Sequence, residues 1–286
     1  MTPEGGAVPV PLRTGDVLLL RARGPLAALT AWFGESRFDH VALVGRAGYL
    51  IETGPDGVVE RALAERLADP DLIEAQARRP LVAQRPLQDA DRIAVLAHAL
   101  SLRRPAFAGD PLAALGRAAA LRDRALPDAA PLRAVLREAL LHAAGDNAGA
   151  MSASEFVYRC LAENPAQPRA RLAPLLPAAS PPTLPFPELD WDALWRQVAP
   201  WLRAPRREAL GVDDRGAVAA GLDASFEQLE QAQGLARQRL GLMERGNALL
   251  AQSGPRQPNP KCLRLRELEQ SPSLQPLATL REPAAS

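Results

Sequence analysis

The sequence predicts an α+β fold, and three observations support this. Short apolar runs of strand length occur at 17–20 and 39–45. Turn signals connect the second run to two further strand segments that reach residue 60. Helical patterns then dominate residues 89–145, interrupted by prolines. The sequence therefore predicts an antiparallel sheet with packed helices.

The first third of the chain supplies the predicted sheet. Residues 1–12 contain three prolines and two glycines, so we expect a flexible arm. Residues 25–33 have the apolar spacing of a short helix. The turns at Ala47-Gly48 and Asp56-Gly57 predict an antiparallel meander over 39–60. The next predicted elements are a helix over 60–68 and a strand over 81–87.

The remainder is predicted to be mostly helical. Prolines divide residues 89–144 into three helices, and Ser152 opens a fourth that stops before Asn164-Pro165. Eight prolines between 165 and 187 favour an extended strap. The last predicted elements are an aromatic-rich helix over 190–202, a long helix over 213–251 and a disordered tail over 252–286.

Composition argues against several classes of function. The 34 basic and 33 acidic residues give a net charge of +1, which offers no field for nucleic acid or an anionic membrane. Cys160 and Cys262, with three histidines, match neither a disulfide framework nor a zinc pattern, so no metal or cofactor is expected. The N-terminal residues lack a basic region followed by an apolar run, so no signal peptide is expected, and no run reaches the roughly 18 apolar residues of a membrane span. A cytoplasmic location is therefore expected, and export without a cleavable signal stays open.

The segment 151–160, MSASEFVYRC, has the sequence of a helix start with a special first turn. Ser152 and Glu155 have the spacing of a capping box, which makes residue 153 the first helical residue. At that position the helix dipole and free backbone N–H groups would stabilise a thiolate and receive an oxyanion. The residue found there is Ala153.

A histidine and a glutamate accompany this helix start. His40 begins an apolar strand, which would hold its imidazole on a rigid element. Glu52 ends the next strand twelve residues later. If the two strands pair, the carboxylate can orient the imidazole as a general base. An exposed histidine at a strand start and a solvated glutamate would give the same pattern.

Four motifs in this order, TGDVLLL, SRFDHVALV, YLIETGPDGVV and SASEFVYR, resemble the circularly permuted branch of the NlpC-like papain-fold cysteine hydrolases. The resemblance covers about 13–87 and 148–178. It implies a permuted papain-like catalytic domain over 13–187 with a helical insertion at about 89–146. A helical extension over 188–251 would follow.

The resemblance also implies a Cys-His-Glu triad that hydrolyses an amide, peptide or related acyl bond. His40 matches the base, Glu52 the orienting carboxylate, and Ala153 the position of the nucleophilic cysteine. Ser154, Asp39 and Tyr158 are candidate substrate-binding residues. The alternatives are a lipid acyltransferase or thioesterase on the same fold, and a pseudoenzyme that binds a peptide or partner without turnover.

Ala153 leaves two readings open, an engineered Cys→Ala change and a natural alanine. Cys160 lies two turns further along the helix, where an apolar environment would raise the pKa of its thiol, so it is a poor substitute. His98 and His142 lie in helical patterns with apolar neighbours and are weaker candidates for the base. Leu222 to Leu250 form a heptad-like seam, so helix 213–251 is a candidate for partner binding or self-association, or it packs on its own domain.

Overall fold

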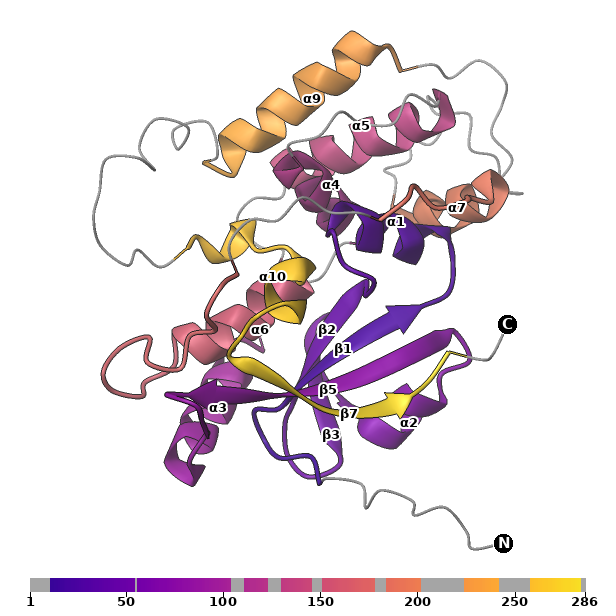
Figure 1. The fold of residues 1–286 in the computed structure, drawn as a ribbon. Helices are drawn as coiled ribbons and strands as arrows, with labels where there is room; N and C mark the ends of the chain where they lie inside the picture. The colour runs from indigo at the N-terminus through magenta and orange to yellow at the C-terminus, as the bar shows by residue number, and fades with distance from the viewer. Residues whose placement is uncertain are drawn as a thin grey trace, which may run out of the picture.

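The computed structural model describes residues 11–54, 56–103, 111–122, 130–145, 151–177, 184–201, 224–241 and 258–283. Within these ranges the chain forms one antiparallel sheet of seven strands and nine α-helices (Figure 1). The α+β fold class and the antiparallel sheet predicted from the sequence are therefore confirmed.

The sheet is built on a meander. Strands β1 to β4 are Val17–Ala22, His40–Val44, Tyr49–Gly54 and Gly57–Ala62. The sheet order runs β4-β3-β2-β1-β5, with every pairing antiparallel. Strand β5 (Leu72–Val82) also pairs with β6 (Arg85–Pro86) and with β7 (Leu274–Arg281).

Both faces of the sheet are covered, which explains the unbroken apolar run of β1. Leu18 and Leu20 lie on the face covered by α2 (Leu63–Ala68), whereas Val17 and Leu19 lie on the opposite face. That opposite face packs against α3 (Asp89–Ser101) and α6 (Ala153–Ala162). A strand that is covered by helices on both faces has no solvent-facing side, so its residues do not alternate between apolar and polar.

A second apolar core is formed by helices alone. It joins α1 (Pro25–Phe33), α4 (Pro111–Leu121), α5 (Ala130–Gly145), α7 (Trp191–Val198) and α9 (Phe226–Arg239). These helices lie together above one end of the sheet in Figure 1. Trp195 is buried in this core and Trp191 and Trp201 pack against it, so the tryptophans of the predicted 190–202 helix are core residues.

The predicted disordered tail over 252–286 is wrong for residues 258–283. This segment forms η3 (Pro260–Cys262), α10 (Leu265–Glu269) and β7, which lies beside β5 in Figure 1. Its Pro, Ser and Gln content hid the strand, because β7 is stabilised by a distant partner and not by its own pattern. Pro276 sits at an irregularity in the register, where a missing N–H is tolerated.

Two other expectations need correction. The strand expected over 81–87 is in fact the end of β5 and the two-residue β6, joined by Ala83 and Gln84 at positive φ. The long helix expected over 213–251 begins only at Phe226, since Ser225 is an extended N-cap, and it ends at Arg239. The flanking parts of that prediction, 213–223 and 242–251, lie outside the described residues.

Helix α9 packs on α4 and α5 of its own chain. Leu229, Ala232 and Ala236 form its buried face.

The first helix of the predicted insertion, α3, belongs to the core of the sheet, because it contributes Val95 and Ala99 to the cluster that packs on the sheet. Within the predicted insertion, α4 is therefore the first helix that belongs to the separate helical core.

Candidate active site

Helix α6 begins as the sequence predicts, with one difference. Ser152 is the N-cap, and its Oγ accepts a hydrogen bond from the backbone N–H of Glu155 at 3.2 Å. The carboxylate of Glu155 does not complete a capping box but pairs with Arg159 at 2.9 Å. Ala153 is the first helical residue, at the positive end of the helix dipole.

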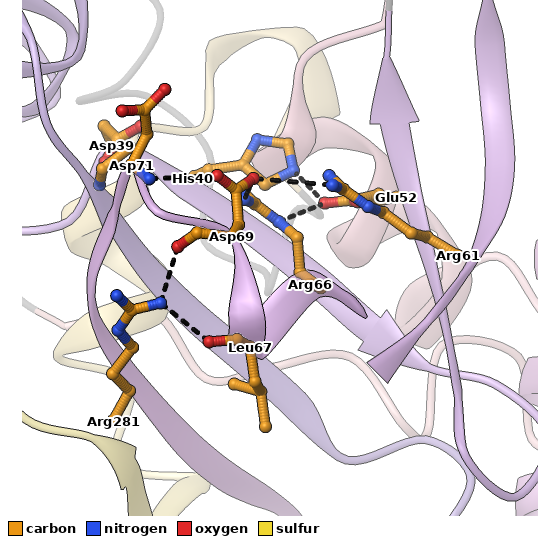
Figure 2. A network of polar contacts seen from close by, with 10 residues as sticks. Asp39, His40, Glu52, Arg61, Arg66, Leu67, Asp69, Asp71 and Arg281 are labelled. Atoms are coloured by element: carbon orange, nitrogen blue, oxygen red, sulfur yellow. Dashed lines mark hydrogen bonds and ion pairs between the residues drawn. The ribbon is translucent and has the colours of Figure 1, made fainter. Parts of the chain in front are cut away.

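His40 and Glu52 are in contact. Strand register pairs Leu43 with Ile51, and its extension sets residue 52 opposite residue 42, on the same sheet face as His40. The imidazole Nε2 lies 3.0 Å from Glu52 Oε2, within hydrogen-bond distance. Figure 2 shows the ring and the carboxylate pointing toward each other. With the carboxylate ionised, Nε2 carries the proton and donates it.

The charge on Glu52 is maintained by its neighbours. Burial raises the pKa of Glu52, but the hydrogen bond from His40 and the charges of His40, Arg66 and Arg61 act in the opposite direction and prevail. The net result is a pKa below the ordinary value, so the carboxylate is ionised at neutral pH. It is then an acceptor only, which fixes the tautomer of the ring.

His40 and Ala153 line the same cavity, which has a volume of about 460 Å³. Because His40 is the first residue of β2, its ring lies at the strand end, where the cavity can reach both it and the N-terminus of α6. Among the residues that the structure describes, no group hydrogen-bonds its Nδ1. This nitrogen is consequently available as a proton acceptor.

Most of the cavity wall away from His40 is apolar. One face of α4 supplies it with small or aliphatic side chains at a helical spacing and with Arg117, and α1 and the C-terminal segment complete it. Arg23, Lys261 and Arg264 also line the cavity. The apolar lining residues are Leu26, Ala27, Pro111, Ala114, Ala118, Leu121, Met151, Leu263 and Leu265. A cavity of this size and lining suits the apolar part of a small ligand.

Two of the three predicted substrate-binding residues line the cavity, but their polar groups hold the fold. Ser154 donates its hydroxyl to the carbonyl of Leu263 at 2.8 Å, which ties α6 to the C-terminal segment. Asp39 accepts a hydrogen bond from the N–H of Ala22 at 2.6 Å. Burial raises the pKa of Asp39, in spite of the lowering effect of that hydrogen bond and of nearby charges.

Tyr158, the third of these residues, is not at the cavity. Its side chain is buried in a small cluster with Ala162 and Leu263, and burial raises the pKa of its hydroxyl. Residue 158 lies on the face of α6 that turns toward the C-terminal segment, which was expected to be disordered.

The alternative reactive groups also lie elsewhere. Cys160 is fully buried under the sheet, and burial raises the pKa of its thiol well above the ordinary value. His98 lies on α3, 4.0 Å from Glu163, and burial lowers its pKa. Neither residue lines the cavity, and nor does His142 on α5.

Sequence reasoning missed several residues at this site. Lys261, Leu263, Arg264 and Leu265 form part of the cavity wall, although they follow Ala153 by more than 100 residues. Arg66 approaches Glu52 from α2. No local motif marks any of them, because each reaches the site through the packing of elements distant in sequence.

The described residues contain no group of three or more His, Cys, Asp or Glu side chains arranged to hold a metal ion. They also contain no helix with the length and apolarity needed to cross a lipid bilayer. A comparison with protein-family models found no model that matches the chain, and a comparison with curated proteins found no matching sequence. Its function is therefore inferred from the motifs and from the site itself.

Proposed function

We propose that this chain has the scaffold of a permuted papain-like thiol hydrolase, which cleaves an amide or related acyl bond when cysteine occupies position 153. The observation that carries this proposal is the 3.0 Å contact between His40 Nε2 and Glu52, with His40 lining a cavity that also includes the first turn of α6. With Ala153 the chain binds its substrate and does not turn it over.

The reaction would follow from the groups at these positions. Nδ1 of His40 takes the proton of the thiol, and the thiolate attacks the carbonyl carbon of the substrate. The resulting oxyanion is received by the free N–H groups at the start of α6. The imidazolium then protonates the leaving group, an acyl-enzyme forms, and water activated by His40 hydrolyses it.

A second candidate function is a thioesterase or acyltransferase. The apolar cavity wall favours it, because such an enzyme binds a substrate with an acyl chain and not a polar peptide. Leu26, Ala114 and Ala118 give a chain apolar contacts, and a cavity of about 460 Å³ has room for several carbon atoms beyond the carbonyl. A thioesterase or acyltransferase would use the same His40 and Glu52. The two candidates differ only in the group that leaves or accepts the acyl chain.

The test restores the thiol and measures turnover. The Ala153→Cys protein would be assayed on p-nitrophenyl esters with short and medium acyl chains and on peptide anilides, with the Ala153 chain as the matched control. We expect turnover only with the cysteine. In the same background His40→Ala should lower kcat by about 10²- to 10⁴-fold. Glu52→Gln should lower it less, because the base remains in place.

The substrate panel separates the candidates. Faster hydrolysis of medium-chain than short-chain esters supports an acyl-chain substrate, whereas preference for anilides supports an amidase. If a folded Ala153→Cys protein turns over none of these compounds, the hydrolase proposal fails. The alternative of a pseudoenzyme that binds a peptide or partner without turnover then takes its place.

A further inference from the structure

The carboxylate of Glu52 contacts two arginines in addition to His40. Arg66 Nε lies 3.5 Å from Glu52 Oε2, and Arg61 Nη1 lies 3.9 Å from Oε1. Figure 2 shows both guanidinium groups beside this carboxylate. Helix α6 also packs on β3, but its Glu155 and Arg159 pair with each other. The charged groups around Glu52 are therefore His40, Arg61 and Arg66.

Of the two arginines, Arg66 is placed to act more strongly. Its side chain is 11% exposed and that of Glu52 is 7% exposed, whereas Arg61 is 40% exposed. Charges that are shielded from water interact more strongly at equal distance. Moreover, Nε of Arg66 is buried and makes no hydrogen bond within the described residues, so Glu52 is its ionic partner.

Arg66 is itself anchored at the other end of its guanidinium. Its Nη1 donates to Asp69 Oδ2 at 2.9 Å. Asp69 is the C-cap of α2, and Arg281 on β7 donates to the carbonyl oxygens of Leu67 at 2.7 Å and Asp69 at 2.6 Å. Figure 2 shows this chain of contacts running from Arg281 to His40.

The ionisation of Glu52 has a consequence at the opposite side of the imidazole ring. An ionised Glu52 accepts a hydrogen bond from Nε2–H, so the proton of the neutral ring stays on Nε2, and Nδ1 is unprotonated and able to act as a base. A protonated Glu52 would instead donate to Nε2, and the proton would then reside on Nδ1. In that tautomer the ring could not accept a proton from a thiol at position 153.

We propose that Arg66 is a positioning residue that holds the Glu52 carboxylate against His40, and that Arg281 on β7 secures the end of α2 on which Arg66 depends. The effect of Arg66 on turnover rests on the proposed hydrolase function. The effect of Arg66 on Glu52 does not, since Glu52 can be titrated in the chain with Ala153.

The first experiment titrates Glu52 by NMR in the Ala153 chain with ¹³C-labelled glutamate, using Glu52→Gln to assign the signal. Arg66→Gln should raise the pKa of Glu52 by roughly 1–3 units, the usual effect of losing an opposite charge at this distance. Arg66→Lys keeps the charge and should restore most of the parent titration. Arg61→Gln is the matched control and should shift the signal less, because Arg61 is more exposed.

Either of two results would overturn the proposal: an unchanged Glu52 titration in Arg66→Gln, or an equal shift in Arg66→Lys. The second would mean that Arg66 acts by packing and not by charge. If Arg66→Gln does not fold, Arg66→Met, which also removes the charge and keeps an apolar stem, takes its place, and an unchanged Glu52 titration in that variant overturns the proposal.

The second experiment repeats Arg66→Gln and Arg66→Lys in the Ala153→Cys background and records kcat against pH. Arg66→Gln should move the acidic limb of the profile to higher pH and lower kcat, with KM unchanged because Arg66 does not line the cavity. Absence of turnover in every background would contradict the hydrolase function alone, whereas an unshifted Glu52 would contradict the role of Arg66 alone.

Discussion

Gly116 on α4 is the point at which the helical layer has least room. A Cβ atom built on Gly116 would lie 1.9 Å from the carbonyl oxygen of Ala139 on α5, about 1.5 Å short of the 3.4 Å at which ordinary contact begins. The obstructing atoms are backbone, so no side-chain rotation can relieve the overlap. The two helices can pack at their present distance only with glycine at this position.

Gly116→Ala should therefore be clearly destabilising. Overpacking typically costs 1–3 kcal/mol, and a rigid backbone contact puts this case near about 3 kcal/mol. Alanine returns about 1 kcal/mol through its higher helix propensity. We expect a net loss of about 2 kcal/mol in the free energy of unfolding.

Gly234 on α9 provides a matched control, because no atom lies within 4 Å of the Cβ that alanine would add there. Gly234→Ala should stabilise the protein by about 0.5–1 kcal/mol. Urea unfolding followed by circular dichroism would give both values. If Gly116→Ala were as stable as the parent, the close contact between α4 and α5 would be incorrect, and with it the position of the cavity wall that α4 supplies.

Four further predictions concern the site and its support. The thiol of Ala153→Cys should react with iodoacetamide well below about pH 8 and faster than Cys160, because the helix N-terminus and the nearby imidazole stabilise a thiolate; mass spectrometry at each cysteine measures this, and equal rates would contradict it. Deleting residues 258–286 should abolish folding or turnover, since it removes β7 and part of the cavity wall, whereas an active, folded truncation would show that this segment is dispensable. In the Ala153→Cys background, Ala118→Leu should reduce cavity space and shift the ester preference toward shorter chains; an unchanged preference would mean that the acyl chain lies elsewhere. The pKa of Glu52 is lower in the folded protein, so its contribution to stability is complete above the ordinary glutamate pKa of about 4.3 and is lost as pH falls through the folded value. The difference in free energy of unfolding between the parent and Glu52→Gln should therefore narrow from pH 6 to pH 3.

Much of the fold could be predicted where a local pattern determines the element. The apolar run of β1, the turns of the β2–β4 meander and the proline-bounded helices α3 to α5 all carry their signal within a few residues. Strand β5 does not, because its buried positions include Glu74, whose charge is compensated by Arg37 at 3.2 Å. Strand β7 lacks a local pattern too and forms because β5 offers it an edge.

The residues of the site also divide into those that a local motif predicts and those that only the packing of distant elements brings together. His40, Glu52 and the first turn of α6 belong to short motifs, and the register of a meander is enough to bring the first two together. The groups that surround them come from distant packing: Arg66 from α2, the apolar face of α4, and Leu263 from a segment that resembles a disordered tail. Burial and charge around Glu52 could therefore not be deduced from the sequence.

The position of β7 in the chain also affects how the protein can be made. Residues 258–281 follow every other element of the sheet, so a ribosome has synthesised β1 to β6 before the last strand is available. During that interval the segment of β5 that β7 will pair with, Ala75 to Pro80, presents an unpaired edge, the kind of surface that pairs with other chains. The cavity wall is also incomplete before then, because Lys261, Leu263, Arg264 and Leu265 are missing from it. An unfinished chain thus has the His40 and Glu52 strands but not the complete cavity wall, which would delay any activity until this segment has been synthesised.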